Sequence, residues 1–381
     1  MSPIPHSSAS SLSRSYEICL VCEAESGIRD SRYEVFVVDV GPCSGGGRRR
    51  RGSRVLRNPL FHIPKNYPMS MCFFAFDSSI YFAGGFFAEG DKLHSSDVYV
   101  YDTSSSDRAI KKLSSMNSTK FMPLVIGPIN DKFYVISGSL LFRDFERFDP
   151  KLDSWVHLSQ PPVQDPVLDA GFQYATITAY AVVNNDREIL LYTKDDLYSY
   201  HTDSDEWFFY ANASIPPTYY ARQIGCVVSI GGDRYLGFKR CGDVCDPNFE
   251  SNHRRCDDDH IVLGTYRYDS SDHTWHDFQY IHDWPLQMYC HAYPMSLGDG
   301  LLAAVVSGYD RRAPLVPDDD DDDDESMLPS THYVSTGLFV DGPNFNPLHT
   351  CLYKEEYNMK RHRREISAAF PLFRWSNRLE S

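Results

Sequence analysis

The sequence lacks several features that would assign it to a familiar class. No stretch approaches the roughly eighteen consecutive apolar residues needed to span a membrane. Its first residues show no basic segment followed by a long apolar run, so we expect no cleaved leader. Basic residues are in deficit, with 37 Lys and Arg against 52 Asp and Glu and a net charge of -15. Because no apolar run could span a membrane, we expect no membrane partner. A general nucleic-acid binder would show a basic face, so we expect no nucleic-acid partner either.

Familiar catalytic motifs are also missing. The sequence has no G-x-S-x-G elbow, no H-E-x-x-H zinc motif and no glycine-rich phosphate loop. We therefore expect no catalytic residue, no cofactor and no enzymatic activity. With no leader expected, the ten cysteines are expected to be reduced thiols, which indicates the cytoplasm or the nucleus.

Aromatic residues are abundant, with 25 Tyr and 23 Phe, and this composition suits β structure. The clearest local pattern runs from Lys132 to Trp155. It holds a short strand that ends at Gly138, a second strand, a turn at Asp149 and Pro150, and an apolar run opened by Trp155. Similar strings recur about every fifty residues, which predicts an array of four-stranded units in one domain.

Tight-turn residues separate the first and second strands of these units. The turns contain Asn-Asp, Gly-Gly-Asp and Asp-Gly, which favour short hairpins. The first strands of the full copies are expected at residues 71–76, 123–127, 179–183, 225–230 and 292–297.

The two ends of the chain supply one further unit. Residues 16–22, 33–40 and 54–57 are typical of its second, third and fourth strands, and residues 365–370 offer the missing first strand. A sheet shared by both termini would close the ring and remove the exposed edges of an open array.

These expectations together predict an all-β fold, a six-bladed β-propeller. Five or seven blades are the alternatives. The propeller would occupy residues 16–375, between a disordered tail at 1–15 and a second tail at 376–381.

Three kinds of residue mark the repeat. Glycine follows the second strand, where the backbone turns between crowded blades. Tyr or Phe lies near the end of the third strand, and Trp opens the fourth. These aromatic rings are large enough to fill the wedge between adjacent sheets. The marker residues are Gly84, Gly85, Tyr101, Gly138, Phe148, Trp155, Tyr200, Trp207, Tyr268, Trp275 and Gly308.

This pattern resembles the kelch repeat over roughly residues 70–340, and the chain is similar to plant kelch-type proteins of the galactose-oxidase-like superfamily. The resemblance implies a propeller used for protein recognition. Many plant relatives carry an F-box before the propeller. About fifteen residues precede the first expected strand, so we expect the F-box to be absent.

The resemblance also raises an enzymatic alternative, because galactose oxidase shares this type of propeller. Its chemistry needs Tyr and His ligands on copper and a Cys-modified Tyr. No arrangement in this sequence can be matched to those ligands residue by residue. Since fold alone does not license an activity, a monomeric interaction module remains our expectation.

Two insertions interrupt the repeat, at residues 239–264 and 309–331, and both lie between the second and third strands of a unit. They should therefore emerge on one face of the ring, where loops on a rigid scaffold commonly bind partners. The first has four basic and six acidic residues, and the second has two basic and nine acidic residues. The expected partner-binding residues are Arg240, Asp257, Asp258, Asp259, Arg311, Arg312, Asp318, Asp320, Asp322, Asp324 and Glu325.

The acidic run of the second insertion has two interpretations. It is either a solvated loop or an attraction for a partner protein rich in Lys and Arg. Two basic clusters, at residues 48–51 and 360–364, are likewise either solvated surface or nuclear import signals.

The first insertion also contains a group of sulfur and imidazole side chains. Such ligands at short spacing can hold Zn²⁺, although this spacing matches no standard zinc finger. A zinc-stabilised binding loop is therefore one hypothesis, and an irregular loop with free thiols is the other. The zinc candidates are Cys241, Cys245, His253, Cys256 and His260.

Overall fold

The structure is a computed structural model. It describes residues 16–24, 31–40, 54–56, 58–87, 93–162, 176–194, 196–211, 225–240, 261–284, 286–298, 301–310, 315–317, 327–329, 331–340, 347–356 and 364–372.

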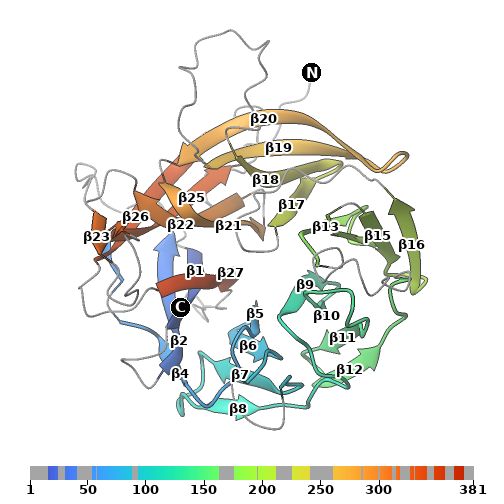
Figure 1. The fold of residues 1–381 in the computed structure, drawn as a ribbon, viewed down its shortest axis with the longest axis horizontal. Coiled ribbons are helices and arrows are strands. Elements are labelled where there is room, and N and C mark those ends of the chain that lie inside the picture. The colour runs from blue at the N-terminus through green and yellow to red at the C-terminus, as the bar shows by residue number, and fades with distance from the viewer. Residues whose placement is uncertain are drawn as a thin grey trace, which may run out of the picture.

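All regular elements within these ranges are β-strands. Figure 1 shows their sheets set around a central axis, in the arrangement of a β-propeller. The all-β propeller predicted from the repeat is therefore confirmed. In the described part of the chain, no helix has the length and hydropathy needed to cross a membrane.

The sequence pattern from Lys132 to Trp155 forms the antiparallel unit that it predicts. Phe133 pairs with Phe148, and Phe148 pairs in turn with Trp155. The preceding copy folds in the same way. The strands of the two sheets are β5 (Cys72–Phe76), β6 (Ser79–Ala83), β7 (Val98–Asp102) and β8 (Ile110–Lys112), then β9 (Pro123–Ile129), β10 (Lys132–Ser137), β11 (Glu146–Asp149) and β12 (Ser154–His157).

The next two units share one eight-stranded sheet, because their innermost strands pair in parallel. Tyr180 lies opposite Cys226 in this pairing, and the Gly225 N–H donates to the Thr178 carbonyl at 2.9 Å. The strands are β13 (Ala179–Val183), β14 (Glu188–Tyr192), β15 (Asp196–His201) and β16 (Glu206–Ala211), then β17 (Gly225–Gly231), β18 (Arg234–Arg240), β19 (Ile261–Asp269) and β20 (Thr274–Trp284).

The chain termini share a sheet, as predicted, with Cys19 opposite Phe370. The fourth strand predicted at residues 54–57 is wrong, because β4 takes that place. Phe61 and Ile63 are buried while His62 and Pro64 are exposed, and this alternation suits a half-buried outer strand. The sheet is β27 (Arg364–Leu372), β1 (Tyr16–Ala24), β2 (Ser31–Val40) and β4 (Phe61–Pro64).

The remaining large sheet has five strands, since Arg54 and Val55 pair in parallel with the outer edge of β26. Its first two strands are longer than the sequence pattern predicts, and Gly308 lies inside β22 and not at its end. The strands are β21 (Leu286–Gly298), β22 (Leu301–Asp310), β25 (Thr331–Val340), β26 (Pro347–Glu356) and β3 (Arg54–Val55), with a separate pair β23 (Leu315–Pro317) and β24 (Met327–Pro329).

Aromatic side chains fill the space between neighbouring sheets, as the sequence predicts. Phe148 of β11 is fully buried and packs with Phe74 and Tyr81 of the preceding sheet. The Trp155 ring stacks on Phe148 with centroids 4.6 Å apart, and its Nε1–H donates to the Ser114 carbonyl of the preceding unit at 3.0 Å. The large rings therefore join the sheets as well as filling the gap between them.

Each unit has two different ends. Its hairpin turns, between the first and second and between the third and fourth strands, lie together; Lys151 in one turn reaches Asp131 in the other, with Nζ and Oδ2 2.6 Å apart. The opposite end carries the links from the second to the third strand and from one unit to the next. There the Gly85 N–H donates to the Lys120 carbonyl at 3.0 Å. We call these ends the turn face and the link face.

Candidate interaction face

Two glycines direct the chain into the link that follows β6. Gly84 and Gly85 have φ angles of 68° and 85°, in the left-handed region that side chains disfavour. A Cβ on Gly85 would lie 2.2 Å from the Met69 carbonyl oxygen, so the main chains approach each other as closely as glycine allows. In the next unit, the Gly138 N–H donates to the Met122 carbonyl at 3.0 Å. The marker glycines therefore bring links of adjacent units together.

A buried ion pair fixes the neighbouring link. Lys120 Nζ lies 2.5 Å from Glu146 Oε1, and both side chains are fully buried. The Glu146 carboxylate also accepts hydrogen bonds from the backbone and side chain of Asn117, each at 2.8 Å, and from Ser118. Burial raises the pKa of Glu146, but hydrogen bonds from Lys120 and Ser118 outweigh that effect, so the net pKa is lowered. The link before β9 is thereby held in one conformation.

Apolar side chains gather on the link face beside this pair. The Phe121 ring centroid lies 5.3 Å from Phe86, 5.2 Å from His94 and 6.0 Å from Phe142. Three apolar residues here are exposed to solvent: the exposed fraction is 65% for Leu93, 49% for Met122 and 36% for Phe142. We call this group the aromatic patch; it comprises Phe86, Leu93, His94, Phe121, Met122 and Phe142.

Met122 has an unusual backbone. Its φ angle is 45°, which a non-glycine residue adopts at a cost of about 1 kcal/mol. Two contacts of the neighbouring main chain hold it there, since the Gly138 N–H donates to both the Phe121 and the Met122 carbonyls. A large apolar side chain, next to Phe121 in the chain, is thus exposed on a backbone held at positive φ.

Both acidic insertions join the second and third strands of a sheet, and the ends of the strands that flank them lie on the link face. The β18–β19 ladder covers the ends of the first insertion, where Arg240 pairs with Ile261. Strands β23 and β24 pair on either side of the acidic run in the second insertion. Apart from Arg240, the expected partner-binding residues Asp257, Asp258, Asp259, Arg311, Arg312, Asp318, Asp320, Asp322, Asp324 and Glu325 lie outside the described residues.

The zinc hypothesis falls outside the described ranges altogether. Its candidate ligands are Cys241, Cys245, His253, Cys256 and His260, and none of them is described. The basic cluster at 48–51 also lies outside, whereas Arg364 of the second cluster begins β27.

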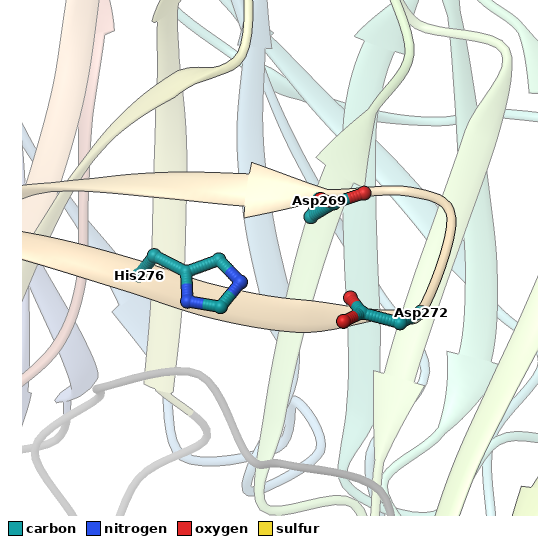
Figure 2. A group of neighbouring side chains, drawn as sticks. All are labelled: Asp269, Asp272 and His276. Atoms are coloured by element: carbon teal, nitrogen blue, oxygen red, sulfur yellow. The ribbon is translucent and has the colours of Figure 1, made fainter.

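One group of described side chains could hold a metal ion. Asp269, Asp272 and His276 each offer a ligand atom within 4.8 Å of the others, on the exposed β19–β20 hairpin (Figure 2). Local hydrogen bonds already engage them. Asp269 accepts from the Ser271 hydroxyl and backbone, which lowers the Asp269 pKa, and Asp272 accepts from Thr274. The group is therefore explained as an ordinary hairpin turn.

The sequence pattern missed a carboxylate two residues before two of the three marker tryptophans, Trp155 and Trp207. Asp153 accepts hydrogen bonds from the Ser114 backbone and hydroxyl, and Asp205 accepts one from the Ser159 backbone at 2.9 Å. Trp207 Nε1–H donates to the Ser159 carbonyl at 2.8 Å. An Asp-x-Trp motif therefore attaches a unit to the preceding one, and its recurrence at residues 153–155 and 205–207 is the signal that could have revealed it.

Comparison with solved structures gives distant likenesses. The structure of YjhT has 13% identity and a TM-score of 0.42, with 77% of this chain and 87% of YjhT covered. Kuenenia stuttgartiensis hydrazine synthase has 8% identity and a TM-score of 0.36, with coverages of 75% and 65%. The N-terminal domain of Nup159 has 11% identity and a TM-score of 0.34, with coverages of 89% and 76%. At this distance they say nothing about what the chain does.

Comparison with sequences identifies a family without an assigned role. The curated proteins contain no match to this chain. The model of one family matches residues 17–217, which is more than half of the chain. The chain therefore belongs to the family described as "Protein of unknown function (DUF1668)".

Proposed function

We propose that this protein is a non-enzymatic, monomeric interaction module that binds another protein through the link face of its propeller. The aromatic patch is the observation that carries the proposal. Exposed apolar side chains gathered at one place on a folded protein are typical of a binding surface, whereas scattered ones need no explanation. The strands that flank both sequence insertions end on this same face, which supports its use for recognition.

The proposal includes a six-bladed, kelch-type ring. Counting the eight-stranded sheet as two units gives six units with the two termini sharing one. The marker glycines and tryptophans act between units, in support of the kelch resemblance. A ring of this kind offers a rigid platform without exposed inner edges.

The partner we propose is a protein with Lys and Arg on its binding surface, met in the cytoplasm or the nucleus. The net charge of -15 favours association with a basic surface. It disfavours anionic membranes and nucleic acids, and therefore these are not proposed as partners.

The test compares link-face and turn-face variants of the tagged protein in affinity purification with quantitative mass spectrometry. The link-face variant carries Met122→Ser and Phe142→Ser, and the control carries Leu152→Ser, a substitution of a 73% exposed residue in a hairpin turn. We expect a set of proteins to be retained by wild type and control and lost from the link-face variant. Equal recovery with all three proteins would contradict the proposal.

A further inference from the structure

We propose that the aromatic patch binds the bulky apolar side chain of an extended peptide segment whose flanking residues are Lys or Arg. This inference rests on the proposed function and specifies the chemistry of the partner. The patch receives the anchor side chain, and the negative field of the molecule attracts the basic flanks.

The composition of the patch indicates an apolar anchor. Its side chains come from three separate segments: Phe86, Leu93 and His94 from the link after β6, Phe121 and Met122 from the link before β9, and Phe142 from the link after β10. His94 meets Phe142 almost perpendicularly, at 84° with centroids 5.5 Å apart. Leu93, Met122 and Phe142 expose apolar area here, and protein interfaces bury large side chains on such surfaces.

Main-chain hydrogen bonds between the links hold the patch in place. The Phe86 main chain exchanges two hydrogen bonds with Met69, at 2.7 and 2.9 Å, and the Lys120 N–H donates to the Ser95 carbonyl at 3.0 Å. The buried Lys120–Glu146 pair holds the segment that leads directly into Phe121. A surface fixed in this way loses little conformational entropy on binding. Met122 supplies the adaptable component, because its thioether side chain fits anchors of different shape.

Charge determines what surrounds the anchor. His94 is the one ionisable member of the patch, and the Lys120 charge is compensated by Glu146. The patch itself therefore favours an uncharged side chain. The whole chain carries -15, so Lys and Arg on either side of the anchor would speed and strengthen association.

The experiment measures fluorescence anisotropy with labelled synthetic peptides of Lys, Arg, Gly and Ser. The first has a central Phe, the second replaces that Phe by Ser, and the third keeps the Phe but replaces Lys and Arg by Glu. Each is titrated with wild type, with Met122→Ser/Phe142→Ser, with Met122→Lys and with the control Leu152→Ser. Equal urea midpoints establish that the variants are folded; the exposed single change Met122→Lys provides the test if the double variant is not.

We expect the basic peptide with central Phe to bind wild type and Leu152→Ser equally, and the patch variants at least about tenfold more weakly. The Ser and Glu peptides should bind wild type weakly, and added salt should reduce binding of the basic peptide. Undiminished binding by both patch variants, equal binding of the Phe and Ser peptides, or absence of binding by all peptides would overturn the inference. Proteins lost selectively from link-face variants in the purification experiment would still support the proposed function in each of those cases.

Discussion

The turn face and the link face of this propeller are built differently. On the turn face, short hairpins place Asp77, Asn130 and Asn184 at positive φ, and these residue types tolerate that conformation. On the link face, the glycine pair and a buried ion pair direct longer segments, and an apolar residue, Met122, adopts positive φ. The conformation of the turn face is thus determined by residues within each turn, whereas the conformation of the link face depends on contacts between distant segments.

This difference teaches where specificity can reside. A turn whose conformation depends only on its own residues can be repeated from unit to unit, where it connects two strands of the same sheet. A link supported by the neighbouring unit can vary in length and composition without disturbing the hairpins. The aromatic patch and the strand ends that flank both insertions occur on the second kind of face.

The ion pairs of the two faces provide the largest expected contrast. Glu146→Ala would leave Lys120 buried without its counter-ion, and we expect a loss of about 3–5 kcal/mol in the free energy of unfolding. Asp131→Asn, which removes the charge of the exposed partner of Lys151 on the turn face and tolerates its φ of 61°, should leave the urea midpoint unchanged. Urea unfolding followed by Trp fluorescence measures both. The combination Lys120→Met with Glu146→Leu is the control and should recover only part of the loss, because the Asn117 and Ser118 donors lose their acceptor. A midpoint unaffected by Glu146→Ala would show that the pair does not support the link.

Glycines at positive φ give a second matched contrast. Gly85→Ala adds a methyl group that meets the Met69 carbonyl, and we expect a loss of more than about 2 kcal/mol. Gly232 on the turn face also has positive φ, at 65°, but no atom lies within 4 Å of an added Cβ, so Gly232→Ala should cost about 1 kcal/mol. Urea midpoints of the two variants decide the comparison. Equal losses would mean that crowding on the link face adds nothing to the cost of placing Ala at positive φ.

Acid should weaken the link face through Glu146. Because its folded-state pKa is lowered, its stabilising contribution is present above the unfolded value of about 4.3 and is lost as the pH falls through the folded value. The difference in unfolding free energy between wild type and Glu146→Gln should therefore narrow as the pH falls below about 4. Urea titrations from neutral to acidic pH test this. A difference in unfolding free energy that stays constant with pH would exclude a charged Glu146. The Lys120→Met/Glu146→Leu protein should lack the pH-dependent contribution of Glu146.

The smallest expected effect concerns Met122. Met122→Gly relieves the positive-φ conformation and should raise the unfolding free energy by up to about 1 kcal/mol, while binding of the basic Phe peptide falls. Asn184→Gly, at a φ of 55° on the turn face, should change stability less, because Asn already tolerates this region. Thermal unfolding measures the gain in stability, and peptide titration measures the loss of binding. Unchanged peptide binding by Met122→Gly would show that the exposed side chain plays no part in recognition.

Much of the scaffold could be predicted from sequence, because its signals are local. The strand from Lys132, the turn at Asp149 and the Trp155 that opens the next strand all follow from residues adjacent in the chain. The shared sheet of the termini followed from the need to close a ring. The pairing of Arg54 and Val55 with β26 could not be predicted, because a two-residue strand carries no periodicity and its partner lies about 300 residues away.

The sequence by itself determined the all-β repeat, the acidic charge and the position of the insertions between second and third strands. Only the tertiary structure brought Phe86, Phe121 and Phe142 together, and showed that the buried Glu146 compensates Lys120. The physical reason is that strand formation and turn chemistry are read within a few residues. Exposure, burial and ring contacts depend on which segments the packing of neighbouring sheets places side by side.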